Sequence, residues 1–66
     1  MAVVKVIEII SEGKTIEAAI EAGIADASKS VRGIKSAWVE STQALCGSKG
    51  KITKYRVGLK LSFVVE

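Results

Sequence analysis

The chain has no histidine and only one cysteine, Cys46, among its 66 residues. With a single cysteine no disulfide can form within the chain, and a free thiol is typical of a reducing compartment, so we expect the protein in the cytoplasm. The lack of histidine removes the commonest metal ligand and the usual general base near neutral pH. The sequence also shows no glycine-rich phosphate loop and no paired carboxylates at catalytic spacing, so we expect no zinc site and no enzymatic activity.

Aromatic residues are few, and charge of one sign is not concentrated. The aromatics are Trp38, Tyr55 and Phe63, and ten basic against seven acidic residues give a scattered net charge of +3. A nucleic-acid-binding protein would show a concentrated basic face with exposed aromatics, so we expect no nucleic-acid partner. No apolar run approaches the roughly 18 residues of a membrane span, and the opening segment lacks the pattern of a signal peptide.

The short length makes oligomerisation the expected source of stability. Residues 1–66 are enough for one domain, and a chain of this size buries only about 60% of its unfolded surface. Small folds usually add disulfides, a metal or partner subunits. Since the first two are not expected here, we predict a homo-oligomer.

The clearest pattern is the alternation from Ile52 to Val65, which predicts one long strand. One face carries Thr53, Tyr55, Val57, Leu59, Leu61, Phe63 and Val65, and the other carries Ile52, Lys54, Arg56, Gly58, Lys60, Ser62 and Val64. Fourteen residues is long against the usual five or six. One short helix cannot cover such a strand, which again indicates other copies of the chain.

The preceding elements complete a β-α-β-β order. Val3 to Ile10 predicts a first strand, broken at 11–14. Thr15 is the expected N-cap of a helix, and an apolar stripe runs from Ile16 to Val31. We expect Gly33 to stop that helix and Gly23 to mark close packing against the sheet. Ile34 to Cys46 predicts the second strand, joined to the third by a loop at 47–50. The fold class is therefore α+β, one helix packed on a three-stranded antiparallel sheet.

The predicted hairpin places Trp38 on the sheet face away from the helix. Two registers fit the apolar pattern, one that pairs Trp38 with Gly58 and Glu40 with Arg56, and one that pairs Trp38 with Lys60 and Thr42 with Arg56. Both put Ser36, Trp38, Glu40 and Thr42 on the same side as Arg56, Gly58 and Lys60.

Three interpretations of Trp38 remain open. It is an interface anchor against a neighbouring subunit, or part of a flat ligand slot beside Gly58, where a missing side chain leaves room, or it is simply exposed.

The order of elements and several short motifs resemble the dodecin family over nearly the whole chain. The matching segments are Lys5-Val6-Ile7-Glu8-Ile9-Ile10, Ile16-Glu17-Ala18-Ala19, Ala27-Ser28-Lys29-Ser30-Val31 and Tyr55-Arg56-Val57-Gly58-Leu59-Lys60-Leu61-Ser62-Phe63. The resemblance implies a hollow homododecamer with helices outside and sheets inside. It also implies binding of flavin, FMN or riboflavin, held between tryptophans and hydrogen-bonded by a glutamine, for storage or buffering.

The resemblance also implies a modified flavin site. The family's flavin-stacking tryptophan falls on Ser36 and its flavin-bonding glutamine on Arg56, so the chain is closer to the subgroup that lacks this tryptophan. Trp38 points to the same face from two residues along the strand, and Trp38, Ser36, Arg56 and Gly58 are the candidate cofactor-binding residues. The alternative is a flavin-free assembly that binds ions, either calcium or anions, or serves a structural role.

Overall fold

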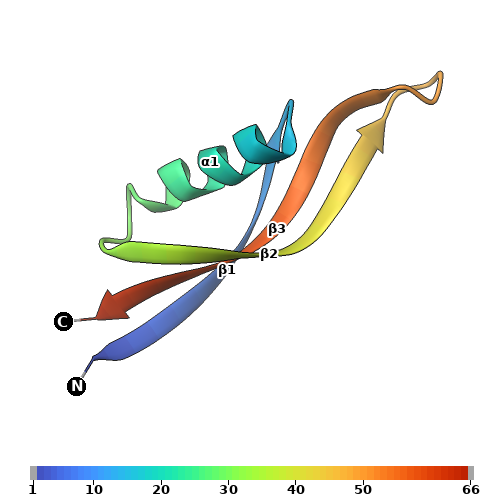
Figure 1. The fold of residues 1–66 in the computed structure, drawn as a ribbon. Helices are drawn as coiled ribbons and strands as arrows, with labels where there is room; N and C mark the ends of the chain where they lie inside the picture. Colours follow the sequence, from blue (N-terminus) through green and yellow to red (C-terminus); the bar gives the residue numbers. More distant parts are fainter. Residues whose placement is uncertain (1, 66) are drawn as a thin grey trace.

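The computed structural model describes residues 2–65, and these form one helix and three strands. The order is β1 (Val3–Gly13), α1 (Ile16–Ala27), β2 (Ile34–Cys46) and β3 (Ile52–Val65). The sheet is antiparallel with β3 in the centre, in the order β1-β3-β2, and α1 lies across one face (Figure 1). This confirms the predicted β-α-β-β fold, including the bounds of β2 and β3.

The first strand is longer than the sequence indicated. We expected a break at 11–14, but β1 continues to Gly13 because this segment stays paired with the central strand: Glu12 lies opposite Arg56 and Gly13 opposite Tyr55. At Gly13 a Cβ atom would lie 2.5 Å from the Ala19 nitrogen. A glycine is therefore required where the chain turns back into the helix.

The helix begins as predicted and ends earlier. Thr15 is the N-cap, and its Oγ1 accepts a hydrogen bond of 3.0 Å from the Ala18 nitrogen. The expected stop at Gly33 is wrong, because α1 ends at Ala27. After Ala27 the backbone forms a turn with hydrogen bonds between residues three apart, such as Ser30 nitrogen to Ala27 oxygen. Gly33, at φ +75°, lies after this turn and directs the chain into β2.

The hydrophobic core lies between α1 and the middle of β3 and is small. Its fully buried apolar residues are Ala19, Val57, Leu59 and Leu61. Gly23 packs closely against the sheet as predicted, since a Cβ there would lie 3.0 Å from Leu59 Cδ1. The core is thus confined to the length of sheet that one short helix covers.

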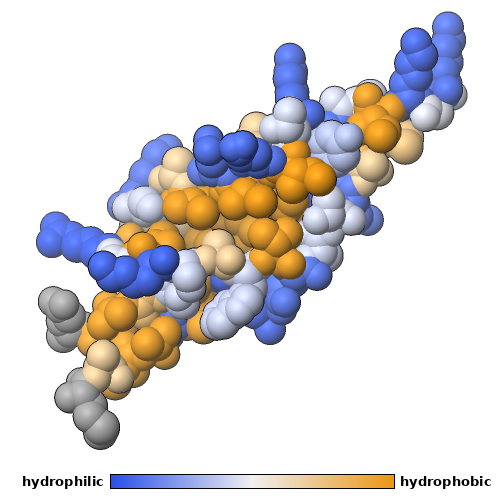
Figure 2. Space-filling model, in the orientation of Figure 1, coloured by the Kyte–Doolittle hydropathy of each residue, from blue (hydrophilic) through white to orange (hydrophobic). Residues whose placement is uncertain are grey.

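Much of the sheet extends beyond the helix. A 12-residue helix is about 18 Å long, whereas a 14-residue strand spans about 46 Å. The molecule measures 52 × 19 × 13 Å, and the hairpin of β2 and β3 projects past α1 (Figure 1). Apolar surface is also visible away from the helix, toward the end of the sheet where β1 starts and β3 finishes (Figure 2).

Candidate functional site

The sheet face opposite α1, called here the open face, carries the candidate site. Strand pairing places its side chains in rows, each with one residue from β1, β3 and β2. Four successive rows are Val6-Ser62-Ser36, Glu8-Lys60-Trp38, Ile10-Gly58-Ser41 and Glu12-Arg56-Gln43. Neighbouring rows are two residues apart, or about 6.6 Å along the strands.

Trp38 lies on the open face with a largely uncovered indole. It pairs with Lys60, as one of the two predicted registers has it for the part of β2 up to Val39, and 55% of its surface is exposed. Val4, Val6 and Ile10 are exposed on the same face, Ile10 at 74%. These four exposed apolar side chains are called here the apolar patch, and polar side chains of Glu8, Lys60, Ser36 and Ser62 lie in the rows among them.

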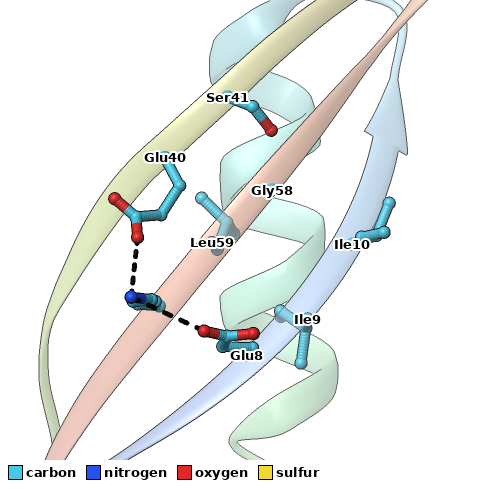
Figure 3. Close-up of a pocket in the computed structure, with 8 residues that line it drawn as sticks. Glu8, Ile9, Ile10, Glu40, Ser41, Gly58 and Leu59 are labelled. Carbon is cyan, nitrogen blue, oxygen red and sulfur yellow. Dashed lines mark ion pairs between the residues drawn. The ribbon is translucent and has the colours of Figure 1, made fainter.

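A hollow of 620 Å³ opens beside this patch, centred on the row of Gly58. Its lining includes Ile10 from β1, Ser41 from β2 and Gly58 from β3, all on the open face (Figure 3). Gly58 has no side chain, and a Cβ there would lie 2.6 Å from Ser41 Oγ. A side chain at this position would clash with Ser41, so the glycine keeps this part of the open face clear.

Lys60 and two carboxylates form one rim of the hollow. The Lys60 Nζ lies 2.9 Å from Glu40 Oε1 and 3.6 Å from Glu8 Oε1, so one ammonium joins carboxylates from the two outer strands (Figure 3). The hydrogen bond to Glu40 and, less strongly, the charge of Glu8 raise the pKa of Lys60 above its ordinary value. Because two carboxylates meet one ammonium, this rim has a net negative charge.

A second ionic cluster lies on the far side of the hollow, around Glu12. Its carboxylate is 2.7 Å from Lys54 Nζ and 2.7 Å from Arg56 Nη2, and Arg56 Nε also donates to it at 2.9 Å. The hydrogen bonds from Lys54 and then Arg56 lower the pKa of Glu12 below its ordinary value. With two cations and one carboxylate this cluster is net positive, so the charge changes sign across the hollow.

The predicted register fails beyond Val39. A β-bulge between Val39 and Ser41 leaves Glu40 as an extra residue, so Thr42 pairs with Val57 and Gln43 with Arg56. Thr42 is therefore not on the open face, where both predicted registers put it. The predicted register that pairs Glu40 with Arg56 is also wrong, since the partner of Glu40 is Lys60.

The four candidate cofactor-binding residues all lie on the open face, in four different rows. Ser36 shares a hydrogen bond between hydroxyls with Ser62, Trp38 lies one row along, Gly58 two and Arg56 three. Ser36 and Arg56 are thus about 20 Å apart along the strands, farther than one three-ring molecule extends. Within one chain the structure groups Trp38 with Gly58 and separates Ser36 from Arg56.

Sequence reasoning missed Glu12, Ser41 and Gln43. The first was assigned to a break in the strand, although its place opposite Arg56 follows once β1 is extended. Ser41 and Gln43 were assigned to the wrong face because strict alternation hides a bulge. No feature of the sequence around Glu40 indicates that bulge.

Residues 2–65 contain no cluster of metal ligands and no membrane-spanning helix. No group of three or more His, Cys, Asp or Glu side chains in this part of the chain is placed to hold a metal ion. None of the helices described here is long and apolar enough to cross a membrane.

The fold and the open face define a small α+β domain with one sheet face covered by its helix and the other available to a ligand or another subunit. The chain belongs to the dodecin family, whose model matches residues 3–66. The tt0972 protein of Thermus thermophilus is 30% identical, with a TM-score of 0.91, and the alignment covers 100% of this chain and 97% of that one. The W38F mutant of the T. thermophilus dodecin is also 30% identical, with a TM-score of 0.90 and coverage of 100% and 98%. Among curated proteins, none is significantly similar in sequence to this chain.

Membership of the family confirms the resemblance, but not the placement within it. The subgroup that lacks the flavin-stacking tryptophan is not supported, because this chain has Trp38 on the open face.

Proposed function

We propose that the protein binds and stores a flavin, riboflavin or FMN, on the open face of its sheet within a homododecameric shell. The observation that carries the proposal is the exposed indole of Trp38, one row from the hollow at Gly58, in a chain of the dodecin family. An indole offers the flat apolar area on which a flavin ring stacks. The single domain 1–66 would act as a binding and buffering module, not as an enzyme.

The charge pattern supports an oriented flavin. The acceptor-rich pyrimidine end of the ring would lie toward the net positive cluster of Glu12, Lys54 and Arg56. The dimethylbenzene end would lie toward Trp38 and Ile10. Free guanidinium hydrogens of Arg56 would donate to the flavin carbonyls.

The site is completed by other copies of the chain. Since Ser36 and Arg56 are about 20 Å apart in one chain, both can contact one ring only if they come from different subunits. Trp38 and Ile10 together expose apolar area that water would otherwise cover, and burial contributes about 25 cal/mol per Å². Subunit association and ligand binding would therefore use the same face.

Titration with riboflavin and with FMN tests the proposal through flavin fluorescence. Stacking on Trp38 should quench the fluorescence, and Trp38→Ala should weaken binding about fivefold to 150-fold, since stacking on an aromatic ring is worth about 1–3 kcal/mol. Tyr55→Phe is the matched control, because Tyr55 is an aromatic on the helix-facing side of β3 opposite Ala44. Unquenched flavin at micromolar wild-type protein would refute the proposal.

The mass of each variant must be measured alongside its affinity. If Trp38→Ala also dissociates the assembly without ligand, the indole is a subunit anchor as well as a stacking group. If affinity falls while the mass is unchanged, its role is confined to the ligand.

A second candidate is a flavin-free assembly that binds ions or serves a structural role. Two observations favour it: Trp38 is not among the residues that line the hollow, and Lys60 on its rim forms ion pairs with both Glu8 and Glu40. Within this candidate a structural role is better supported than anion binding, because Lys54, Arg56 and Lys60 are each paired with a carboxylate, which lowers their attraction for free anions. A colourless preparation after purification, with no flavin absorption bands and no uptake of added flavin, would decide for this candidate.

A further inference from the structure

Part of β2 pairs with β3 one residue out of register with the hairpin on either side of it. Toward the base of the hairpin Trp38 lies opposite Lys60. Near the loop Cys46 lies opposite Ile52, which is the same register. Residues 41–45, between these pairs, are shifted by one position along β3. The shift therefore begins and ends inside the hairpin.

Two irregularities, one in each strand, bound the shifted segment and cancel each other. In β2 the extra residue is Glu40, and in β3 it is Thr53, which falls between the partners of Leu45 and Cys46. The Thr53 hydroxyl donates a hydrogen bond of 3.1 Å to the Leu45 carbonyl, so a side chain takes part where the ladder is irregular. Removal of both irregularities together would give one uniform register without moving either end of the hairpin.

The uniform register would cost the fold little, because the shifted segment is not covered. A change of register by one residue moves every side chain of a strand to the other face, which is strongly disfavoured only where one face is buried. Here Ser41, Thr42, Gln43 and Ala44 are all exposed, and none of the buried apolar residues found in the described part of the chain belongs to this segment. The ladder would also regain the residues that the bulges leave unpaired.

The two registers differ in the side chain that lies over Gly58. In the structure Ser41 is opposite Gly58, and its Oγ lies 2.6 Å from the position that a Cβ of residue 58 would take. The side chain opposite the glycine thus leans over it. Glu40 is directed instead to its ion pair with Lys60 (Figure 3). In the uniform register Glu40 would lie opposite Gly58, and its longer side chain would project into the 620 Å³ hollow that Ser41 leaves open.

We propose that residues 41–45 exchange between these two registers and that the exchange gates the hollow, which is open with Ser41 opposite Gly58 and closed with Glu40 opposite Gly58. The role in ligand uptake rests on the proposed function, whereas the exchange itself does not. A ligand that fills the hollow binds only the bulged register and shifts the population toward it.

Cross-strand disulfides report the two registers separately, because a disulfide needs Cα atoms about 4.4–6.8 Å apart, as in directly opposite residues. In a Cys46→Ser background, Leu45→Cys with Lys54→Cys reports the bulged register, and Ala44→Cys with Lys54→Cys reports the uniform one. Thr42→Cys with Lys54→Cys is opposite in neither register and gives the background rate. In a glutathione buffer the uniform-register pair should close about tenfold to 100-fold more slowly than the bulged-register pair, as for a minor state of about 1–10%, and faster than the background pair.

Titration of the cross-linked proteins with riboflavin tests the gate. The disulfide between positions 44 and 54 should abolish quenching of the flavin, and its reduction should restore quenching. The disulfide between positions 45 and 54 should leave affinity equal to that of the same protein after reduction. Light scattering checks that each protein keeps the wild-type mass.

Closure of the uniform-register pair no faster than the background pair would overturn the exchange. Equal riboflavin affinity of the two cross-linked proteins would overturn the gate while the proposed function stands. If the wild-type protein binds no flavin, the proposed function fails and the role in ligand uptake with it, but the cross-linking rates still decide whether the register exchanges.

Discussion

At the scale of single residues, Glu12 connects the site to the fold. It is a carboxylate on β1 that holds two cations on β3, Lys54 and Arg56, and it fixes the guanidinium through two hydrogen-bond donors. The same contacts lower the pKa of Glu12. Protonation of this one group therefore releases both an interstrand link and the orientation of Arg56.

A pH dependence follows from the direction of that shift. Since the pKa of Glu12 is lower in the folded state, the unfolded state binds the proton more readily, and stability is lost as the pH falls below the ordinary value of 4.5 toward the folded pKa. We expect Glu12→Gln to be less stable than wild type at pH 7 and to lose less stability on acidification. Unfolding of both proteins with guanidinium chloride at a series of pH values from 7 to 3, at fixed protein concentration, measures the stability at pH 7 and its loss on acidification.

Glu21→Gln is the control for this prediction, because Glu21 is exposed on α1 and makes no ion pair within residues 2–65. It should keep the wild-type pH profile. Identical acid profiles for wild type and Glu12→Gln would show that the Glu12 cluster contributes nothing to folding.

At the scale of elements, periodicity predicted which segments form the helix and strands, but not every place where they end. Alternation predicted β3 and both of its end residues correctly. The alternation is regular because one face of the strand is buried against the helix through Val57, Leu59 and Leu61. The end of α1 was misjudged because the apolar stripe continues to Val31 in a turn that is no longer α-helical. An apolar stripe indicates which side chains face the core, but it does not indicate whether the backbone there forms α-helical hydrogen bonds.

The candidate site was harder to predict than the fold for a related reason. Trp38 and Gly58 were placed on the correct face because they lie where pairing is regular. Gln43 was not, because the bulge at Glu40 reverses the alternation after it, and a bulge changes the geometry of pairing without a distinct composition. The pairing of Glu12 with Arg56 follows only from the extension of β1 to Gly13, which alternation in the sequence does not indicate.

The start of α1 supplies a test at this scale. Thr15 Oγ1 accepts from the Ala18 nitrogen and satisfies one of the amides that have no partner within the helix. Thr15→Ala should lower the free energy of unfolding by about 1 kcal/mol, whereas Thr15→Ser, which keeps the hydroxyl, should cost only a few tenths. Denaturant unfolding followed by circular dichroism compares the two, and equal stability of Thr15→Ala and Thr15→Ser would contradict the role of the cap.

At the scale of the whole molecule, the chain is more extended than a compact domain of its length. Its radius of gyration is 13.7 Å, against about 11 Å for a compact chain of 66 residues. Only one stretch of one sheet face is covered by the helix, and the open face keeps Val4, Val6, Ile10 and Trp38 exposed. This distribution is what a subunit shows when the other half of its core comes from neighbouring copies.

The proposed assembly makes a quantitative prediction. Twelve copies of a 7.0 kDa chain should scatter light as a particle of about 84 kDa in the absence of any ligand.

Ile10→Lys should shift that mass toward smaller species, because a side chain that is 74% exposed in one chain adds little to its own fold but would be desolvated between copies. Ser48→Lys, in the loop between β2 and β3, adds the same charge away from the open face and should keep the wild-type mass. A wild-type particle of 7 kDa in dilute buffer would contradict the assembly, and equal masses for Ile10→Lys and wild type would show that subunits associate through another surface.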